Sequence, residues 1–213
     1  PMLGCYGASN VITPNIDALA ARGTVFLKNY CQQAVCAPTR ASLMTGLRPD
    51  ATKVWDLKTQ LRDMVPNVVT MPQYFVQQGY ATTGIGKVFD VRSVDKQLDA
   101  PSWSIPYQKL NDDDYAKGYE KPAGGHYQAK STLDLLARFQ SEAKNKGLNE
   151  EQTKEFMDKN RVVVEAGDVP DDAYSDGAIA RKAGKILASL KNQDKPFFLA
   201  VGFSKPHLPF VSP

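Results

Sequence analysis

The sequence predicts an α/β fold in which a mostly parallel sheet is sandwiched between helices. Helical segments with one apolar face alternate with short apolar runs, which is the pattern of such folds. The run at 197–203, Phe-Phe-Leu-Ala-Val-Gly-Phe, is unbroken, as in a strand that is covered on both faces. With 213 residues, 42% of them hydrophobic, the chain is long enough to bury a core.

The first expected helix begins after Thr13 and ends at Gly23. Thr13 can cap the helix, Pro14 suits its first position, and Gly23 suits its end. The three apolar residues at 25–27 follow directly, and we expect them to form a short buried strand.

A second helix is expected from Pro38 to Gly46. Its start places Cys36 at or just before the N-terminus of the helix. A third helix is predicted at 72–78. The segment 80–85 contains several small residues and is predicted to be a strand.

The stretch from about 91 to 168 is polar and rich in turn residues, and we interpret it as an insertion over the surface or over the mouth of a site. It contains an expected helix at 131–146 and a second helix capped by Asn149. Three consecutive aspartates at 112–114 lack the alternating spacing of a calcium loop, which favours a solvated turn. His126 lies beside two glycines and is expected to be exposed.

A long amphipathic helix is predicted at 171–190, before the apolar strand at 197–203. Lys195 and Pro196 separate the two elements. The residues expected to face inward from the helix are Ala178, Ile179, Ala183, Ile186, Leu187 and Leu190.

Charge and cysteine content exclude several classes of protein. The net charge of +3 is small and basic residues alternate with acidic ones, so no stripe for nucleic acid or a membrane surface is present. No apolar run approaches the length of a bilayer span. Three cysteines are too few for a disulfide scaffold, and the sequence leaves open whether Cys5 and Cys31 pair. The chain opens at Pro1-Met2 and stops just after an expected strand, so we expect a fragment of a longer protein.

The most informative motif is Cys36-x-Pro38-x-Arg40, followed by Gly46. A helix N-terminus binds oxyanions through its unpaired N–H groups, and Cys36 lies where such an anion would dock. Arg40, about one turn further on, can donate two hydrogen bonds to a pair of oxygens. The alternatives are a buried free cysteine and a surface arginine.

Two further candidates follow predicted strands. Lys87 comes after the strand at 80–85, and His207 comes after the strand at 197–203. Open α/β sheets bind ligands at the carboxyl ends of their strands. A histidine there can protonate a leaving oxygen near neutral pH. The alternatives are an exposed loop lysine and a structural histidine.

The chain resembles the type I sulfatases of the alkaline phosphatase superfamily, most closely the iduronate-2-sulfatase-like branch. The resemblance covers nearly the whole sequence and implies that residues 1–213 are the N-terminal part of the catalytic domain. It is carried by the segments 3–7, 14–17, 33–38, 46–50, 86–89 and 197–210.

The resemblance implies a role for each candidate. Cys36 would be oxidised to formylglycine by a maturation enzyme and would serve as the nucleophile and, when hydrated, as a calcium ligand. Arg40 would hold the hydrated aldehyde, Lys87 would contact the sulfate, and His207 would be the general acid. One hydroxyl of the hydrated aldehyde would attack sulfur, and the second would then expel sulfate. The implied substrate is a sulfated saccharide, and the implied location is periplasmic or secreted.

Asp90 departs from the family pattern, because it stands where a histidine serves the elimination step. Asp90 itself or another group could act as the base. The family's remaining acidic calcium ligands fall outside the chain, and calcium needs about six oxygen ligands. We therefore expect the chain alone to bind calcium weakly and to be inactive.

Three functions are compatible with these residues. The leading hypothesis is a sulfatase that acts on a sulfated carbohydrate. The second is a phosphonate or phosphate monoester hydrolase of the same superfamily. The third is a non-catalytic carbohydrate-binding relative, which the departure at Asp90 suggests.

Overall fold

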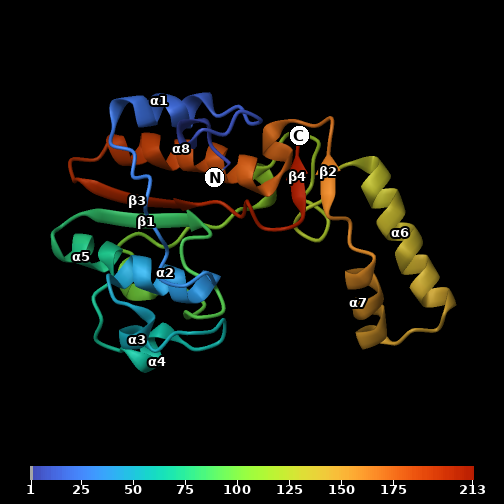
Figure 1. Ribbon diagram of the computed structural model, residues 1–213, viewed down its shortest axis with the longest axis horizontal. Coiled ribbons are helices and arrows are strands. Elements are labelled where there is room, and N and C mark those ends of the chain that lie inside the picture. The colour runs from blue at the N-terminus through green and yellow to red at the C-terminus, as the bar shows by residue number, and fades with distance from the viewer. Residues whose placement is uncertain (1) are drawn as a thin grey trace.

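The computed structural model describes residues 2–213 and shows helices packed on parallel strands, as the sequence predicts (Figure 1). Strands β1 (Ala81–Gly86) and β3 (Phe197–Gly202) pair in parallel along their full length. A second parallel pair joins β2 (Val164–Ala166) to β4 (Phe210–Ser212). Both strand pairs are therefore parallel.

The other elements are helices. The α-helices are α1 (Pro14–Arg22), α2 (Cys36–Thr45), α3 (Pro49–Thr52), α4 (Leu61–Met64), α5 (Met71–Gln77), α6 (Lys130–Asn145), α7 (Glu150–Lys159) and α8 (Ser175–Lys191). Short 3₁₀ turns span Gly4–Tyr6, Ala100–Ser102, Asp112–Asp114 and Asp171–Ala173.

The strand pair lies between two helical layers, with α8 on one side and α5 and α2 on the other (Figure 1). Phe75 of α5 stacks on Phe198 of β3, with ring centroids 4.8 Å apart. On the opposite face, Ile85 of β1 packs against Ile179 and Ala183 of α8. Because side chains alternate between the faces of a strand, the two contacts use opposite faces of one sheet.

A second apolar cluster fixes α2 beneath the ends of the strands. It joins α2 to the segment that follows β1, and both carry candidate site residues. Its buried members are Ala37, Ala41, Met44, Val54, Leu61, Val88, Phe89, Val94 and Leu98. Val94 and Leu98 therefore lie in the core, although they belong to the polar stretch that starts at about residue 91.

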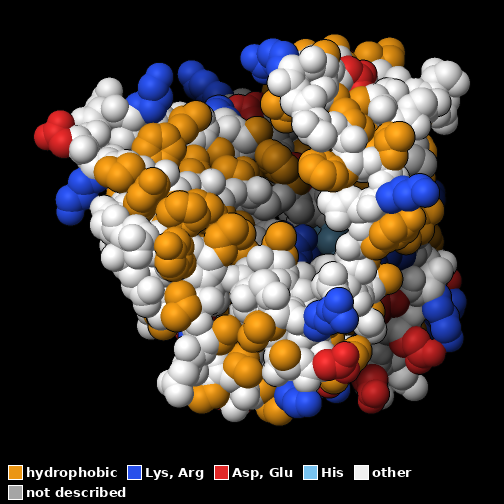
Figure 2. All heavy atoms as spheres, turned by 60° about the vertical axis from the view of Figure 1, so that its left-hand side comes forward, with side chains coloured by type: hydrophobic (Ala, Val, Ile, Leu, Met, Phe, Trp, Pro, Cys, Tyr) orange, Lys and Arg blue, Asp and Glu red, His pale blue; other side chains and the backbone are white. Residues whose placement is uncertain are grey.

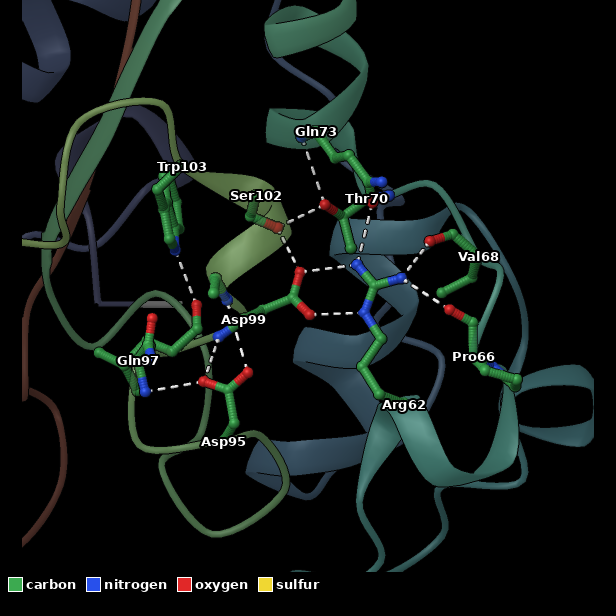
Figure 3. A network of polar contacts seen from close by, with 12 residues as sticks. Arg62, Pro66, Val68, Thr70, Gln73, Asp95, Gln97, Asp99, Ser102 and Trp103 are labelled. Atoms are coloured by element: carbon green, nitrogen blue, oxygen red, sulfur yellow. Dashed lines mark hydrogen bonds and ion pairs between the residues drawn. The ribbon is translucent and has the colours of Figure 1, made fainter.

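A buried polar network holds the segment after β1 against α4 and α5 (Figure 3). The carboxylate of Asp99 accepts two hydrogen bonds from Arg62, at 2.6 and 2.9 Å. Ser102 contacts both Asp99 and Thr70, and Thr70 also caps α5 by accepting from the Gln73 N–H. Asp99 is completely buried, but its partners satisfy both oxygens.

The caps and breakers predict the helices well. Helix α1 begins at Pro14, but the Thr13 side chain donates to the Asp17 carboxylate and does not cap the helix. Helix α7 follows the Asn149 cap, whose side chain accepts from the Gln152 N–H. Helix α2 starts two residues before Pro38, which makes Cys36 its first residue. The helix predicted from 171 instead starts at Ser175, because a 3₁₀ turn precedes it.

Three apolar predictions are wrong. Residues 25–27 form an exposed irregular segment, with Phe26 67% and Leu27 76% exposed, and none of the strands in residues 2–213 pairs with it. The strand β3 is only partly buried, because β1 alone flanks it in the described chain. Leu187, predicted to face inward, is 41% exposed because it lies at the edge of the α8 face that covers the sheet.

Two polar predictions also need correction. Asp114 is buried and forms an ion pair with Lys182 of α8 at 2.7 Å, so the turn at 112–114 is only partly solvated. His126 is half-buried because it packs edge-on against Tyr127. Cys5 and Cys31, whose pairing the sequence leaves open, are free thiols.

Candidate active site

The N-terminus of α2 presents Cys36. Val35 has an extended backbone, the helix begins at Cys36, and its first turn contains no acidic residue. The N–H groups of a first helical turn lack partners within the helix and carry partial positive charge. Cys36 is therefore placed where the backbone favours a negative group.

Two glycines bring the carboxyl ends of β1 and β3 close together. Gly86 has a φ of 78°, and a Cβ there would lie 1.9 Å from the carbonyl oxygen of Gly202. A Cβ on Gly202 would lie 2.1 Å from the Lys87 oxygen. Only glycine allows this approach, which lets the Lys87 N–H donate to Gly202 O at 2.9 Å. The segments that carry Lys87 and His207 consequently leave the sheet side by side.

The Sγ atom of Cys36 lies 3.1 Å from Nε2 of His207. The other ring nitrogen, Nδ1, contacts the backbone oxygen of Ser204. A carbonyl oxygen only accepts, so Nδ1 carries a proton in this contact. Neutral His207 then offers Nε2 as an acceptor toward Cys36, and the protonated ring offers a donor there.

The loop that carries His207 is attached to the start of α8. Both oxygens of the Asp176 carboxylate accept backbone hydrogen bonds, from Ser204 N at 2.8 Å and from Lys205 N at 2.9 Å. The Lys205 ammonium donates to the carbonyl of Pro209 at 2.6 Å. The backbone on both sides of His207 is thereby fixed, and so is the carbonyl that orients its ring.

Arg40 lies about one turn after Cys36 in α2. Its Nη1 donates to the backbone oxygens of Lys87 and of Val88, the latter at 2.9 Å. Its Nε is buried and has no hydrogen-bond partner among residues 2–213. The guanidinium thus ties α2 to the segment after β1 and keeps an unused donor. Its expected contact with a hydrated aldehyde stays a prediction.

Lys87 and Arg92 share the carboxylate of Asp90. Lys87 Nζ lies 2.9 Å from Oδ2, while Arg92 approaches Oδ1 through Nε at 2.8 Å and Oδ2 through Nη2 at 2.9 Å. Asp90 is completely buried. Hydrogen bonds from Arg92, and secondarily from Lys87, hold the pKa of Asp90 well below its usual range, although burial raises it. The carboxylate therefore stays ionised and is a weak base.

The sequence alone missed two residues of this arrangement. Arg92 follows Asp90 in a turn that no motif marks, and only the fold reveals the ion pair. Asp176 lies in the first turn of α8, where an acidic residue is common for reasons of helix stability alone. In contrast, the sequence alone identifies the other three candidates. Cys36 lies at a helix start, and Lys87 and His207 each follow a strand.

The cluster is positively charged. Lys87 and Arg92 flank the single carboxylate of Asp90, and Arg40 binds the backbone of the same segment at Val88. The N-terminus of α2 adds partial positive charge. Figure 2 shows one face of the molecule with a hollow, at the bottom of which basic and histidine side chains are visible. Such a site is suited to a tetrahedral anion.

The described residues do not form a complete metal site. Within residues 2–213, no three or more His, Cys, Asp or Glu side chains are grouped so that they could hold a metal ion. Asp90, the acidic residue nearest Lys87, is occupied by two cations. Separately, none of the helices described is long and apolar enough to cross a bilayer.

Comparison with known proteins points to one family. The model of the sulfatase family matches residues 1–213. Iduronate 2-sulfatase of Mus musculus is 36% identical over 215 residues, and that of Homo sapiens is 36% identical over 218 residues. Each alignment covers 100% of this chain and 34% of the relative, so the chain spans about a third of their length.

Solved structures agree on the fold. The crystal structure of a phosphonate monoester hydrolase of Agrobacterium radiobacter matches with a TM-score of 0.57 and 22% identity. The match covers 99% of this chain and 39% of that one. At this level of identity the likeness establishes the architecture and leaves the reaction to the residues of the site.

Proposed function

The chain belongs to the sulfatase family, and on that premise we propose that it supplies the nucleophile and the general acid of a sulfuric ester hydrolase that acts on a sulfated carbohydrate. The observation that carries the proposal is the 3.1 Å contact between Cys36 Sγ and His207 Nε2. It joins the cysteine of the motif to a proton donor, beside the cationic cluster at Lys87.

The surroundings of Cys36 suit its conversion to formylglycine. The thiol occupies the position that the hydroxyls of the hydrated aldehyde would take. The start of α2 offers backbone donors for added oxygens. The Nε of Arg40, which has no partner among the described residues, is assigned as a further donor. The hydrated aldehyde would supply one hydroxyl as the nucleophile and a second hydroxyl, on the same carbon, that can later expel the sulfate. A serine lacks this second hydroxyl and would keep the sulfate as a stable ester.

His207 is assigned the protonation of the departing alcohol. Its Nδ1 is held by Ser204 O, so Nε2 points toward the reacting position at Cys36. Protonation at this nitrogen turns an alkoxide into a neutral leaving group. Lys87 and the N-terminus of α2 neutralise the negative charge of the sulfate.

Asp90 is assigned a positioning role. Its two cationic partners lower its pKa, so it is poorly suited to take a proton in the elimination step. It instead holds the ammonium of Lys87 at 2.9 Å. We therefore assign the base of the elimination step to a group other than Asp90. With such a base, the replacement of the family's histidine by Asp90 is compatible with sulfatase activity.

The wider assignments belong to the same proposal. They are calcium with Cys36 as one ligand, a formylglycine-generating maturation enzyme, and a periplasmic or secreted location. Because the described residues form no complete metal site, we expect calorimetry to detect only weak calcium binding to this chain. Micromolar affinity would contradict that expectation.

A phosphonate or phosphate monoester hydrolase remains the second candidate. A cationic site for a tetrahedral anion serves either reaction, and the fold likeness to a phosphonate monoester hydrolase is compatible with both. The test is the rate of the full-length protein on matched aryl sulfate and aryl phosphonate esters. Faster sulfate hydrolysis supports the proposal, and faster phosphonate hydrolysis supports the second candidate. The absence of both activities supports the non-catalytic relative.

A further inference from the structure

Arg92 lies in reach of whatever Lys87 binds. The Nζ of Lys87 and the Nη2 of Arg92 both lie 2.9 Å from the same oxygen, Oδ2 of Asp90. The two nitrogens therefore cannot be further apart than twice that distance. The two cations are therefore close enough to contact neighbouring groups of one ligand.

The cluster carries more positive than negative charge. One buried carboxylate serves two cations, so a single positive charge is left unbalanced. The Arg92 side chain is 50% exposed, and its Nη1 makes no hydrogen bond to the part of the protein that the structure describes. A guanidinium with one edge anchored and another free is arranged to bind an anion.

The position of Arg92 does not depend on its side chain. Its carbonyl accepts from Gln60 Nε2 at 2.7 Å, and its N–H donates to Asp90 at 3.1 Å. The next residue, Ser93, accepts from the Leu61 N–H at 2.9 Å. Because backbone contacts hold this turn against α4, removal of the guanidinium is expected to leave the local fold in place.

We propose that Arg92 determines specificity by binding a second anionic group of the saccharide, a carboxylate or a further sulfate, beside the ester that Lys87 contacts. The inference rests on the proposed function and deepens it. Asp90 orients both cations, so that one buried carboxylate couples recognition of the ester to recognition of its neighbour.

The test uses the full-length protein with Arg92→Ala and Arg92→Lys. Three substrates share one sulfate ester: a neutral sugar monosulfate, the same sugar with a carboxylate, and the same sugar with a second sulfate. For Arg92→Ala we expect the preference in kcat/KM for a doubly anionic substrate over the neutral one to fall about tenfold or more, mainly through KM. Arg92→Lys is expected to recover part of it.

The matched control is Arg22→Ala, which removes an exposed guanidinium from α1. It is expected to leave all three kcat/KM values unchanged. An equal loss on all three substrates in Arg92→Ala overturns the inference, since a purely structural role affects them alike. An unchanged preference overturns it too. If the variant loses its preference for the carboxylated sugar, the group that Arg92 binds is a carboxylate. If it loses its preference for the doubly sulfated sugar, that group is a sulfate. A wild-type protein that hydrolyses none of the sulfates instead overturns the proposed function, and the inference with it.

Discussion

Cys36 Sγ and His207 Nε2 lie 3.1 Å apart, although 171 positions separate the residues in the chain. One begins α2 and the other follows β3. Helix α2 packs against the segment after β1, and β1 pairs with β3. The contact thus depends on the pairing of β1 with β3 and on the packing of α2 against the segment after β1.

His207→Ala is expected to slow the hydrolysis of alkyl sulfates more than that of nitrophenyl sulfate. An alkoxide needs a proton to leave, whereas nitrophenolate is stable without one. We expect a loss of about 10²–10⁴-fold in kcat for the alkyl ester, measured by steady-state kinetics on the full-length protein. His126→Ala is the control for removal of an imidazole. An equal loss on both esters would contradict the role of general acid.

Asp176→Asn is expected to show the same dependence on the leaving group, in weaker form. The amide keeps one acceptor oxygen where the carboxylate offers two to Ser204 N and Lys205 N. The loop that orients His207 then loosens, and we expect about a tenfold loss on alkyl sulfates. Reduced stability without a change in leaving-group dependence would show that Asp176 only supports the fold.

Gly86→Ala is expected to destabilise the protein far more than Gly79→Ala. Both glycines have positive φ, 78° and 83°, so each substitution brings the strain of the left-handed region, about 1–2 kcal/mol. At Gly79 the new methyl group meets nothing within 4 Å, whereas at Gly86 it meets Gly202 O at 1.9 Å. We expect a further loss of about 2 kcal/mol or more at Gly86, measured by urea unfolding. Equal losses would show that the strand ends do not need this approach.

Asp90→Asn is expected to lower the free energy of unfolding at neutral pH by about 1–3 kcal/mol, because two cations lose their carboxylate. The pKa of Asp90 is lowered in the folded state, so its contribution is fully present above its ordinary value of 3.8. The contribution is lost as pH falls through the lowered pKa. The difference between wild type and variant should therefore be constant above about pH 5 and shrink in acid.

Urea unfolding at a series of pH values measures this difference. Asp63→Asn, on an exposed position of α4, controls for the loss of one negative charge. A wild-type advantage that grows as the pH falls would contradict the assigned direction of the pKa shift.

The sequence predicts the helices because their ends are marked by local chemistry. Pro14, Gly46 and the Asn149 cap act within a few residues of where they stand. The prediction of a strand at 25–27 was wrong, because an apolar run becomes a strand only when a partner strand lies beside it, and no described strand does so here. The three-residue strand β2 escaped prediction, because it pairs with residues at 210–212.

The candidate site follows the same division. Cys36, Lys87 and His207 could be selected because helix starts and strand ends are general binding positions. Asp176 and Arg92 could not, since their roles arise from contacts made only after folding.

The most direct test of the account is the mass of the peptide that contains Cys36, from protein produced in cells with an active maturation enzyme. Conversion of cysteine to formylglycine is predicted to make this peptide about 18 Da lighter. Cys31 is a free, exposed thiol outside the motif, and its mass should stay that of cysteine. An unmodified Cys36 in such cells would contradict the assignment of sulfatase chemistry.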